Sequence, residues 1–171
     1  MVDYLHLESF NSIWFWIFLA LTWSARSHWT LGVPFDAVVR ADRDPDRWGP
    51  SVDTLARVHA KRYDHVVRNV PITLVTLSAF VVTALLTASF VFWIEIAQAV
   101  LVTAVPLMIV TWGEIRLARR VLVEDIEGSP LRRRLVWRRF INQLWGVASI
   151  SSAAGFVVID VLSRRVVEPI L

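Results

Sequence analysis

The fold is decided by residues 70–112, VPITLVTLSAFVVTALLTASFVFWIEIAQAVLVTAVPLMIVTW, which form one nearly continuous apolar block. Glu95 and Gln98 interrupt this block, together with scattered serines and threonines. A transmembrane helix needs roughly 20 apolar residues, so a block of about 43 residues suits two spans. We expect the turn between the two spans near residues 87–94.

Two further apolar blocks flank this pair, one before it and one after it. The sequence therefore predicts an all-α fold, a four-helix transmembrane bundle with amphipathic helical extensions, built as a single domain over residues 1–171. The predicted spans are approximately residues 7–29, 70–89, 92–113 and 140–162. The clean apolar part of the first block is shorter than a full span, so a re-entrant or interfacial helix is the alternative there.

The composition excludes several classes of protein and of site. The chain is 56% hydrophobic and 19% charged, more apolar than a soluble domain of this size can bury. It contains no cysteine, which excludes disulfides, thiolate metal sites and cysteine nucleophiles. None of the four histidines falls at mid-membrane, where haem ligands would be needed. We expect no cofactor and no bound metal.

Two polar segments, residues 30–69 and 114–139, separate the apolar blocks. In the first, Ser51 follows Gly49-Pro50 and is a good N-cap for an amphipathic helix that lies on the membrane or leads into the second span. In the second, the third helix is expected to continue to about Glu127 and to stop at Gly128. A new helix capped by Ser129 should then run unbroken into the last span.

The basic residues predict the orientation in the membrane. Of the 18 lysines and arginines, eight lie within residues 24–69, eight lie within residues 114–139, and the last two are Arg164 and Arg165. This division of 16 to 2 places both polar segments in the cytoplasm of a bacterial inner membrane, with both termini in the periplasm. The basic runs adjoin apolar spans, which favours anionic lipid as a partner and excludes a nucleic-acid module.

Six polar residues are candidates for ligand binding. An acid inside a span is a functional candidate by default, which applies to Glu95 with Gln98 one turn away. The alternative is that Glu95 lies at the outer interface, where an acid costs little. The other four candidates precede the second span: Arg57, His59, Arg62 and Asp64. Asp42, Asp44, Asp46 and Asp53 have the spacing of a calcium loop, but Arg47 stands where glycine is needed, so we predict a solvated turn.

Two other groups of residues predict contacts with lipid and between helices. The basic run is a candidate lipid-headgroup anchor and comprises Arg132, Arg133, Arg134, Trp137, Arg138 and Arg139. In the last span, Gly146, Ser149, Ser152 and Ala153 form a stripe of small residues that permits close helix packing. The stripe could serve the bundle itself or a partner protein.

The first resemblance lies near the N-terminus, in residues 12–17 (SIWFWI), 23–24 (WS), 27–29 (SHW) and 31–36 (LGVPFD). It is similar to the opening of a four-helix membrane family of alphaproteobacteria whose members often carry the label "component of the SufBCD complex". The resemblance implies a membrane accessory role.

The second resemblance covers residues 57–71, RVHAKRYDHVVRNVP. This stretch is similar to the MAPEG family of glutathione-dependent membrane enzymes, which are four-helix proteins and often trimers. The family's asparagine position is Asp64 here, and its glutamate position is Val67. The resemblance implies a cytoplasmic-side site lined by Arg57, His59, Arg62 and Asp64.

Three functional hypotheses follow. The leading one is a non-catalytic accessory, assembly or structural subunit of a larger inner-membrane complex, with other membrane subunits or a second copy of the chain as partners. The second is a MAPEG-like glutathione-dependent enzyme. The third is a small transporter or channel that uses Glu95 and Gln98.

Overall fold

The computed structural model describes residue 10 and residues 12–167, and residues 7–9 and 11 of the predicted first span lie outside this part of the chain. The described residues form six helices and one short β-hairpin. In chain order these are α2 (Ile13–His28), β1 (Trp29–Thr30), β2 (Val33–Pro34), α3 (Phe35–Arg43), α4 (Pro45–Asn69), α5 (Pro71–Phe90), α6 (Glu95–Val123) and α7 (Gly128–Val167).

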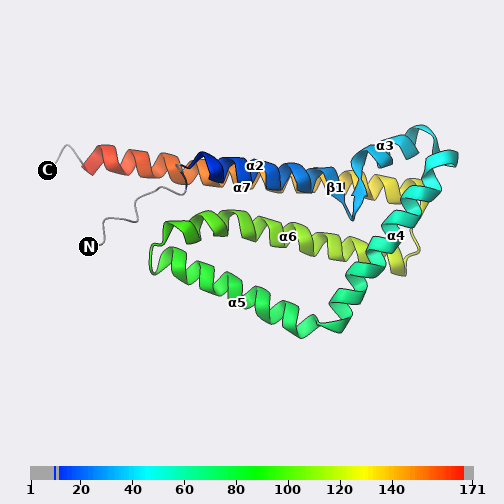
Figure 1. The fold of residues 1–171 in the computed structure, drawn as a ribbon, viewed down its shortest axis with the longest axis horizontal. Coiled ribbons are helices and arrows are strands. Elements are labelled where there is room, and N and C mark those ends of the chain that lie inside the picture. The colour runs from blue at the N-terminus through cyan, green and yellow to red at the C-terminus, as the bar shows by residue number, and fades with distance from the viewer. Residues whose placement is uncertain (1–9, 11, 168–171) are drawn as a thin grey trace.

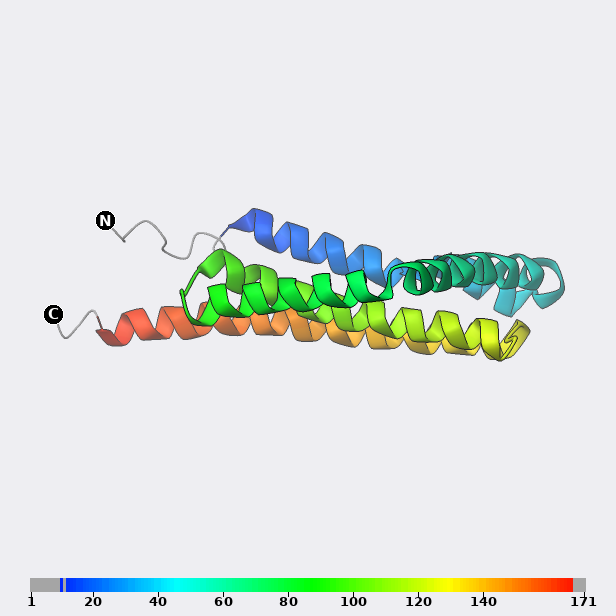
Figure 2. The same cartoon turned by 90° about the horizontal axis from the view of Figure 1, so that it is seen from below.

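The apolar helices α2, α5, α6 and α7 lie side by side with their long axes roughly aligned (Figures 1 and 2). The β-hairpin, α3 and α4 gather at one end of this bundle, around the C-terminal part of α6 and the N-terminal part of α7 (Figure 1). We call this end the cap, defined as residues 29–69 and 114–139. Helix α2 begins and α7 ends away from the cap, and α4 crosses the cap obliquely toward α5.

Three of the helices, α5, α6 and α7, are long and apolar enough to cross a membrane. The chain is therefore an all-α, multi-pass membrane protein by length and composition. The predicted division of the central apolar block is confirmed, because α5 ends at Phe90 and α6 begins at Glu95. Helix α2 is apolar but has 16 residues, a length of about 24 Å against a hydrocarbon layer of about 30 Å.

The β-hairpin is an element that the sequence analysis did not predict. Trp29 pairs with Pro34 and Thr30 with Val33, which leaves Leu31 and Gly32 as a two-residue turn. Both turn residues have positive φ, 51° and 72°, as tight hairpin turns require. A Cβ atom on Gly32 would also lie 2.3 Å from the ring of His59 on α4, so glycine is needed here for two reasons.

The start of the amphipathic helix was predicted wrongly. Helix α4 begins at Pro45 rather than after Ser51, because Asp44 accepts a hydrogen bond from the backbone N–H of Arg47 at 3.3 Å and proline suits the first helical position. The aspartate-rich stretch is thus a boundary between α3 and α4. The apolar face of α4 packs against the rest of the cap through Val52 and Ala56, which are buried.

In the connection between α6 and α7, the end of α6 differs from the prediction, whereas the unbroken course of α7 agrees with it. Helix α6 ends at Val123, and Asp125 in the following loop has a φ of 49°. Gly128 begins α7 instead of ending α6, since its N–H donates to the carboxylate of Asp53 on α4, at 3.0 and 3.1 Å to the two oxygens. From there α7 runs unbroken for 40 residues into the last apolar block, as predicted.

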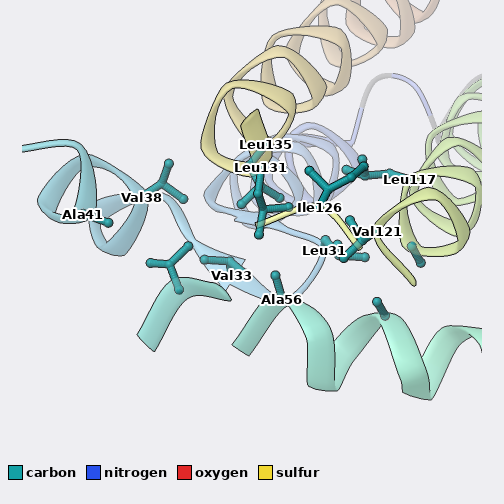
Figure 3. Packing of buried hydrophobic residues seen from close by; sticks show 13 residues of the cluster. Leu31, Val33, Val38, Ala41, Ala56, Leu117, Val121, Ile126, Leu131 and Leu135 are labelled. Atoms are coloured by element: carbon teal, nitrogen blue, oxygen red, sulfur yellow. The ribbon is translucent and has the colours of Figure 1, made fainter. Parts of the chain in front are cut away.

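Two separate clusters of buried apolar side chains hold the molecule together. The cap core joins the hairpin, α3, α4 and the ends of α6 and α7 (Figure 3). It comprises Leu31, Val33, Val38, Ala41, Val52, Ala56, Ala60, Leu117, Ala118, Val121, Ile126, Leu131 and Leu135. The bundle core joins α2, α6 and α7 and comprises Phe10, Leu19, Trp23, Ala99, Val110 and Ala153.

Candidate functional site

Glu114 on α6 is a fully buried carboxylate between the two apolar cores. Its relative exposure is 0%. Val110, one turn before it, belongs to the bundle core, and Leu117, one turn after it, belongs to the cap core. Residues three and four apart share a helix face, so Glu114 lies on the buried face of α6 at the junction of bundle and cap.

Three helices each send one polar side chain to this carboxylate. Arg26 of α2 places its Nη2 3.0 Å from Oε2. The phenol of Tyr63 on α4 donates to the same oxygen at 3.2 Å, and the amide of Asn142 on α7 donates to Oε1 at 3.3 Å. One carboxylate on α6 therefore connects α2, α4 and α7.

A second arginine lies beside the first. The Arg138 guanidinium on α7 donates from Nη2 to the backbone carbonyl of Val110. It lies against Gly113, where a Cβ atom would come within 2.1 Å of its nitrogens. Glycine at this position is what lets α7 bring a guanidinium so close to α6. We refer to Arg26, Tyr63, Glu114, Arg138 and Asn142 as the Glu114 cluster.

The electrostatics of the cluster follow from its burial. A buried carboxylate is tolerated only when it is paired and hydrogen-bonded, and Glu114 has an ion pair and two hydrogen bonds. Burial raises the pKa of Tyr63 above its ordinary value, and the negative charge of Glu114 raises it further. The phenol therefore stays protonated near neutral pH and can act as a donor.

The cluster holds four helices together around a carboxylate that solvent does not reach. Its carboxylate has no exposed surface, and its donors come from three different helices. Among the described residues, no group of three or more histidines, aspartates and glutamates could hold a metal ion. The cluster itself consists of an ion pair and hydrogen bonds between helices.

The four residues predicted before the second span do not meet at one site. Arg57 forms ion pairs with Asp125 and Glu127 in the loop between α6 and α7, and the hydrogen bond with Asp125 raises the pKa of Arg57. His59 lies against Gly32 of the hairpin. These two residues therefore serve contacts between α4 and separate parts of the cap.

The remaining two of the four lie closer to α5. Asp64 pairs with Arg68 on its own helix at 2.7 Å and approaches Arg119 on α6 at 4.0 Å. Arg62 is exposed. Asp64 thus adds another contact between α4 and α6.

Glu95 and Gln98 lie at the first turn of α6, at the end of the bundle away from the cap. Glu95 is 8% exposed, and its Oε1 accepts a hydrogen bond from the backbone N–H of Phe10 at 3.1 Å. The Gln98 amide donates to the carbonyl oxygen of Ser89 at 3.0 Å, which closes the turn between α5 and α6. Both polar groups take part in chain connections at this end.

The predicted lipid anchor is divided between protein contacts and exposed side chains. Arg132 is buried beside Asp42, Arg134 pairs with Glu124 at 3.0 Å, and the guanidinium of Arg139 lies 3.5 Å from the ring centroid of Phe35. Arg138 belongs to the Glu114 cluster. Arg133 and Trp137 are exposed.

The stripe of small residues on α7 packs inside the molecule. A Cβ atom on Gly146 would lie 3.1 Å from the ring of Trp23, so α2 crosses α7 closely there. Ser149 donates to the backbone carbonyl of Val102 on α6 at 2.9 Å, and Ala153 is fully buried in the bundle core. Ser152 differs, since it is exposed and donates to Ala148 of its own helix.

The position of Glu114 in the sequence does not mark it as a candidate, because this residue follows the predicted span 92–113 and is the first residue of a polar segment. A signal for it does exist in the sequence. Glu114 is four residues after Val110 and three before Leu117, so it falls on the apolar stripe of α6. A carboxylate on such a stripe predicts a buried partner, although the sequence does not say which of the many arginines provides it.

The chain was compared with protein-family models, with curated proteins and with solved structures. None of the three comparisons found a match.

Proposed function

We propose that this protein is a non-catalytic accessory or structural subunit of a larger complex in a bacterial inner membrane. In this proposal it crosses the bilayer with α2, α5, α6 and α7. Three of these helices are long and apolar enough to cross, and α2 runs alongside α7 from the far end of the bundle to the cap. Because α2 runs alongside a helix that is long enough to span, we infer that α2 is a fourth transmembrane crossing.

The Glu114 cluster is the observation that carries the proposal. Catalysis and transport require polar groups that reach a substrate, whereas Glu114 is fully buried and joins four helices to one another. Buried charged groups of this kind cost stability to desolvate and in some proteins are retained because they specify one arrangement. A fixed arrangement of helices is what a structural subunit offers to its partners.

The charge distribution supports a cytoplasmic cap. The cap holds 15 of the 18 basic residues, and Arg26, in the last turn of α2, adds one more at the same end. Positive residues near the ends of spans are retained on the cytoplasmic side. Trp137 is exposed on α7, three residues before Phe140, and would contact anionic headgroups there.

Helix α5 offers the surface for a partner. A narrow stripe that includes Leu74 and Val82 is half-buried, while most of its other side chains are exposed. Ile72 and Phe80 are 80% and 69% exposed. In the assembled complex we expect a transmembrane helix of a partner subunit to pack on this apolar face.

The enzyme and transporter hypotheses have weaker support. Arg57, His59 and Asp64 contact different parts of the cap, so they do not converge on a glutathione-sized ligand. Glu95 and Gln98 bond to backbone groups at one end of the bundle. Neither arrangement exposes a set of convergent polar groups.

A photo-crosslinking amino acid at position 80 tests the proposal in the native host. We expect Phe80→benzoylphenylalanine to give one discrete adduct with another membrane protein, which also co-purifies with the unmodified chain in mild detergent at a fixed ratio. The matched control is the same amino acid at Leu74, which is half-buried on the same helix and should give no such adduct. Loss of the assembly on deletion of the gene would support a structural role.

Two results would overturn the proposal. One is turnover of a substrate by the purified chain alone. The other is an unchanged set of membrane complexes after deletion, with adducts at position 80 confined to lipid.

A further inference from the structure

A hollow of about 400 Å³ lies between α3 and the first turns of α7, in the part of the cap farthest from the bundle. We call it the α3–α7 hollow. Its lining consists of Val38, Val39, Asp42, Arg43, Ser129, Arg132, Arg133 and Val136. The volume falls in the range of small-molecule sites, roughly 300–1,000 Å³.

The lining of the hollow is strongly positive. Three arginines face one aspartate, which leaves a net charge of two positive. The aspartate side chain is 78% exposed, so solvent screens its charge. The first turn of α7 carries no acidic residue of its own, although Asp53 of α4 accepts from the first N–H. The carboxylate of Asp53 therefore offsets the helix dipole of α7, and the positive potential of the hollow comes from its arginines.

Arg132 contributes a buried donor to the lining of the hollow. Its side chain is 9% exposed, and its Nε makes no hydrogen bond to any described residue. The nearest acid, Asp42, is 3.6 Å away, beyond the distance of a hydrogen bond between charged groups. A buried donor left in this state is costly, and an oxyanion in the hollow would accept from it.

We propose that the α3–α7 hollow binds a phosphate dianion carried by a small molecule, with Arg43, Arg132 and Arg133 as the charged contacts. Guanidinium groups match phosphate oxygens geometrically, and the charge of the dianion equals the net charge of the lining. Ser129 adds a hydroxyl donor at the start of α7. Val38, Val39 and Val136 provide an apolar wall for the rest of the molecule.

The position of the hollow favours a ligand from solution over a lipid headgroup. Arg132 precedes Phe140, where the charged stretch ends, by eight residues, which is about 12 Å along the helix axis. The headgroup layer on one side of a bilayer is about 5–8 Å thick. The hollow thus lies beyond that layer. This proposal does not depend on the accessory role, since a structural subunit and an enzyme could equally bind such a ligand.

Calorimetric titration of the full chain in phosphatidylcholine nanodiscs tests the site. The probe is inorganic phosphate at about pH 8, where the dianion is the main species. We expect saturable binding at one site. Arg132→Gln should weaken it by about tenfold or more, the value of one charged hydrogen bond. Arg43→Gln should weaken it similarly and, because Arg43 is exposed, should leave the thermal unfolding midpoint unchanged.

Arg62→Gln is the matched control, because it removes the same charge from an exposed position of the cap outside the hollow. It should bind phosphate like the unmodified chain. Absence of saturable binding would overturn the proposal, as would an equal loss of binding in Arg62→Gln and Arg43→Gln. Nanodiscs that contain phosphatidylglycerol distinguish a lipid phosphate from a soluble one. If this lipid weakens the binding of inorganic phosphate, and does so less in Arg43→Gln, the site belongs to a lipid phosphate. If the lipid leaves phosphate binding unchanged, the result supports a soluble ligand.

Discussion

At the scale of single residues, Glu114 shows how one side chain can decide the arrangement of several helices. Its carboxylate receives Arg26, Tyr63 and Asn142 from three helices at distances of 3.0–3.3 Å. No other carboxylate among the described residues has a relative exposure of 0%. The ion pair and hydrogen bonds to these partners offset the free-energy cost of burying the carboxylate. Removing its negative charge should therefore destabilise the fold, because the partners would lose their acceptor.

We predict that Glu114→Gln lowers the free energy of unfolding by about 1.5–3 kcal/mol, because it leaves the half-buried Arg26 without its counter-charge. The measurement is equilibrium denaturation by SDS in mixed micelles. Glu124→Gln is the control, since its pair with Arg134 is on the surface and should contribute about 1 kcal/mol or less. Equal effects of the two substitutions would contradict a structural role for Glu114.

The environment of Tyr63 predicts that the stability of the fold decreases at high pH. Burial and the charge of Glu114 raise the pKa of the phenol in the folded state above the unfolded value of about 10. A raised pKa means that the stabilising contribution is complete below about pH 10 and is lost as the pH rises through the folded value. Absorbance titration should therefore show one of the two tyrosines ionising late, and Tyr63→Phe should remove this late phase. A phase at the ordinary tyrosine pKa that disappears in Tyr63→Phe would refute the prediction.

At the scale of elements, the long helices were predictable and the cap was not. Length and apolarity alone place α5, α6 and the end of α7, because the bilayer requires about 20 apolar residues per span. The hairpin and α3 lie in residues 29–43, a stretch rich in turn formers and charges that resembles a loop. Their stability comes from the cap core, because elements as short as these are marginal without tertiary packing.

The partners within the candidate site were unpredictable for a related reason. A polar residue on an apolar helix face predicts a buried polar contact, but it does not identify the side chain that makes this contact. Arg26 and Glu114 are 88 positions apart, and the chain holds 17 arginines that could have served. The packing of α2 against α6 and α7 selects this one.

Proline inside α6 explains why α7 carries Ser149. Pro106 has no N–H, so the carbonyl of Val102 loses its helical donor, and the hydroxyl of Ser149 donates to that carbonyl at 2.9 Å. We predict that Ser149→Ala lowers the free energy of unfolding by about 1–2 kcal/mol. Ser152→Ala on the same helix should change it by less than about 0.5 kcal/mol, since Ser152 is exposed and bonds within α7.

A double-mutant cycle distinguishes this explanation from simple packing. Pro106→Ala restores an amide donor to Val102, so Ser149→Ala should cost less in that background than in the natural chain. Equal costs in both backgrounds would mean that the missing proline N–H is irrelevant to the role of Ser149. SDS denaturation in mixed micelles again provides the free energies.

At the scale of the whole molecule, the cap and the bundle form one continuous structure. Helices α6 and α7 pass through both apolar cores, and the Glu114 cluster joins the cores where they meet. Ion pairs between Arg57 and the α6–α7 loop, together with the bond from Gly128 to Asp53, hold α4 across the end. The cap is therefore fixed in position relative to the bundle, so the side of the membrane on which the cap lies would define the topology of the chain.

The absence of cysteine makes this topology directly measurable, because any introduced thiol is unique. We predict that Phe92→Cys, in the exposed turn between α5 and α6, reacts with a membrane-impermeant maleimide added to intact spheroplasts. Thr54→Cys, exposed on the cap, should react only after permeabilisation if the cap lies in the cytoplasm, as the positive residues predict. Ser12→Cys distinguishes a spanning α2 from an interfacial one, since it lies at the far end of α2 from the cap. Labelling of Ser12→Cys from outside supports four crossings, whereas labelling of Thr54→Cys from outside would contradict the orientation.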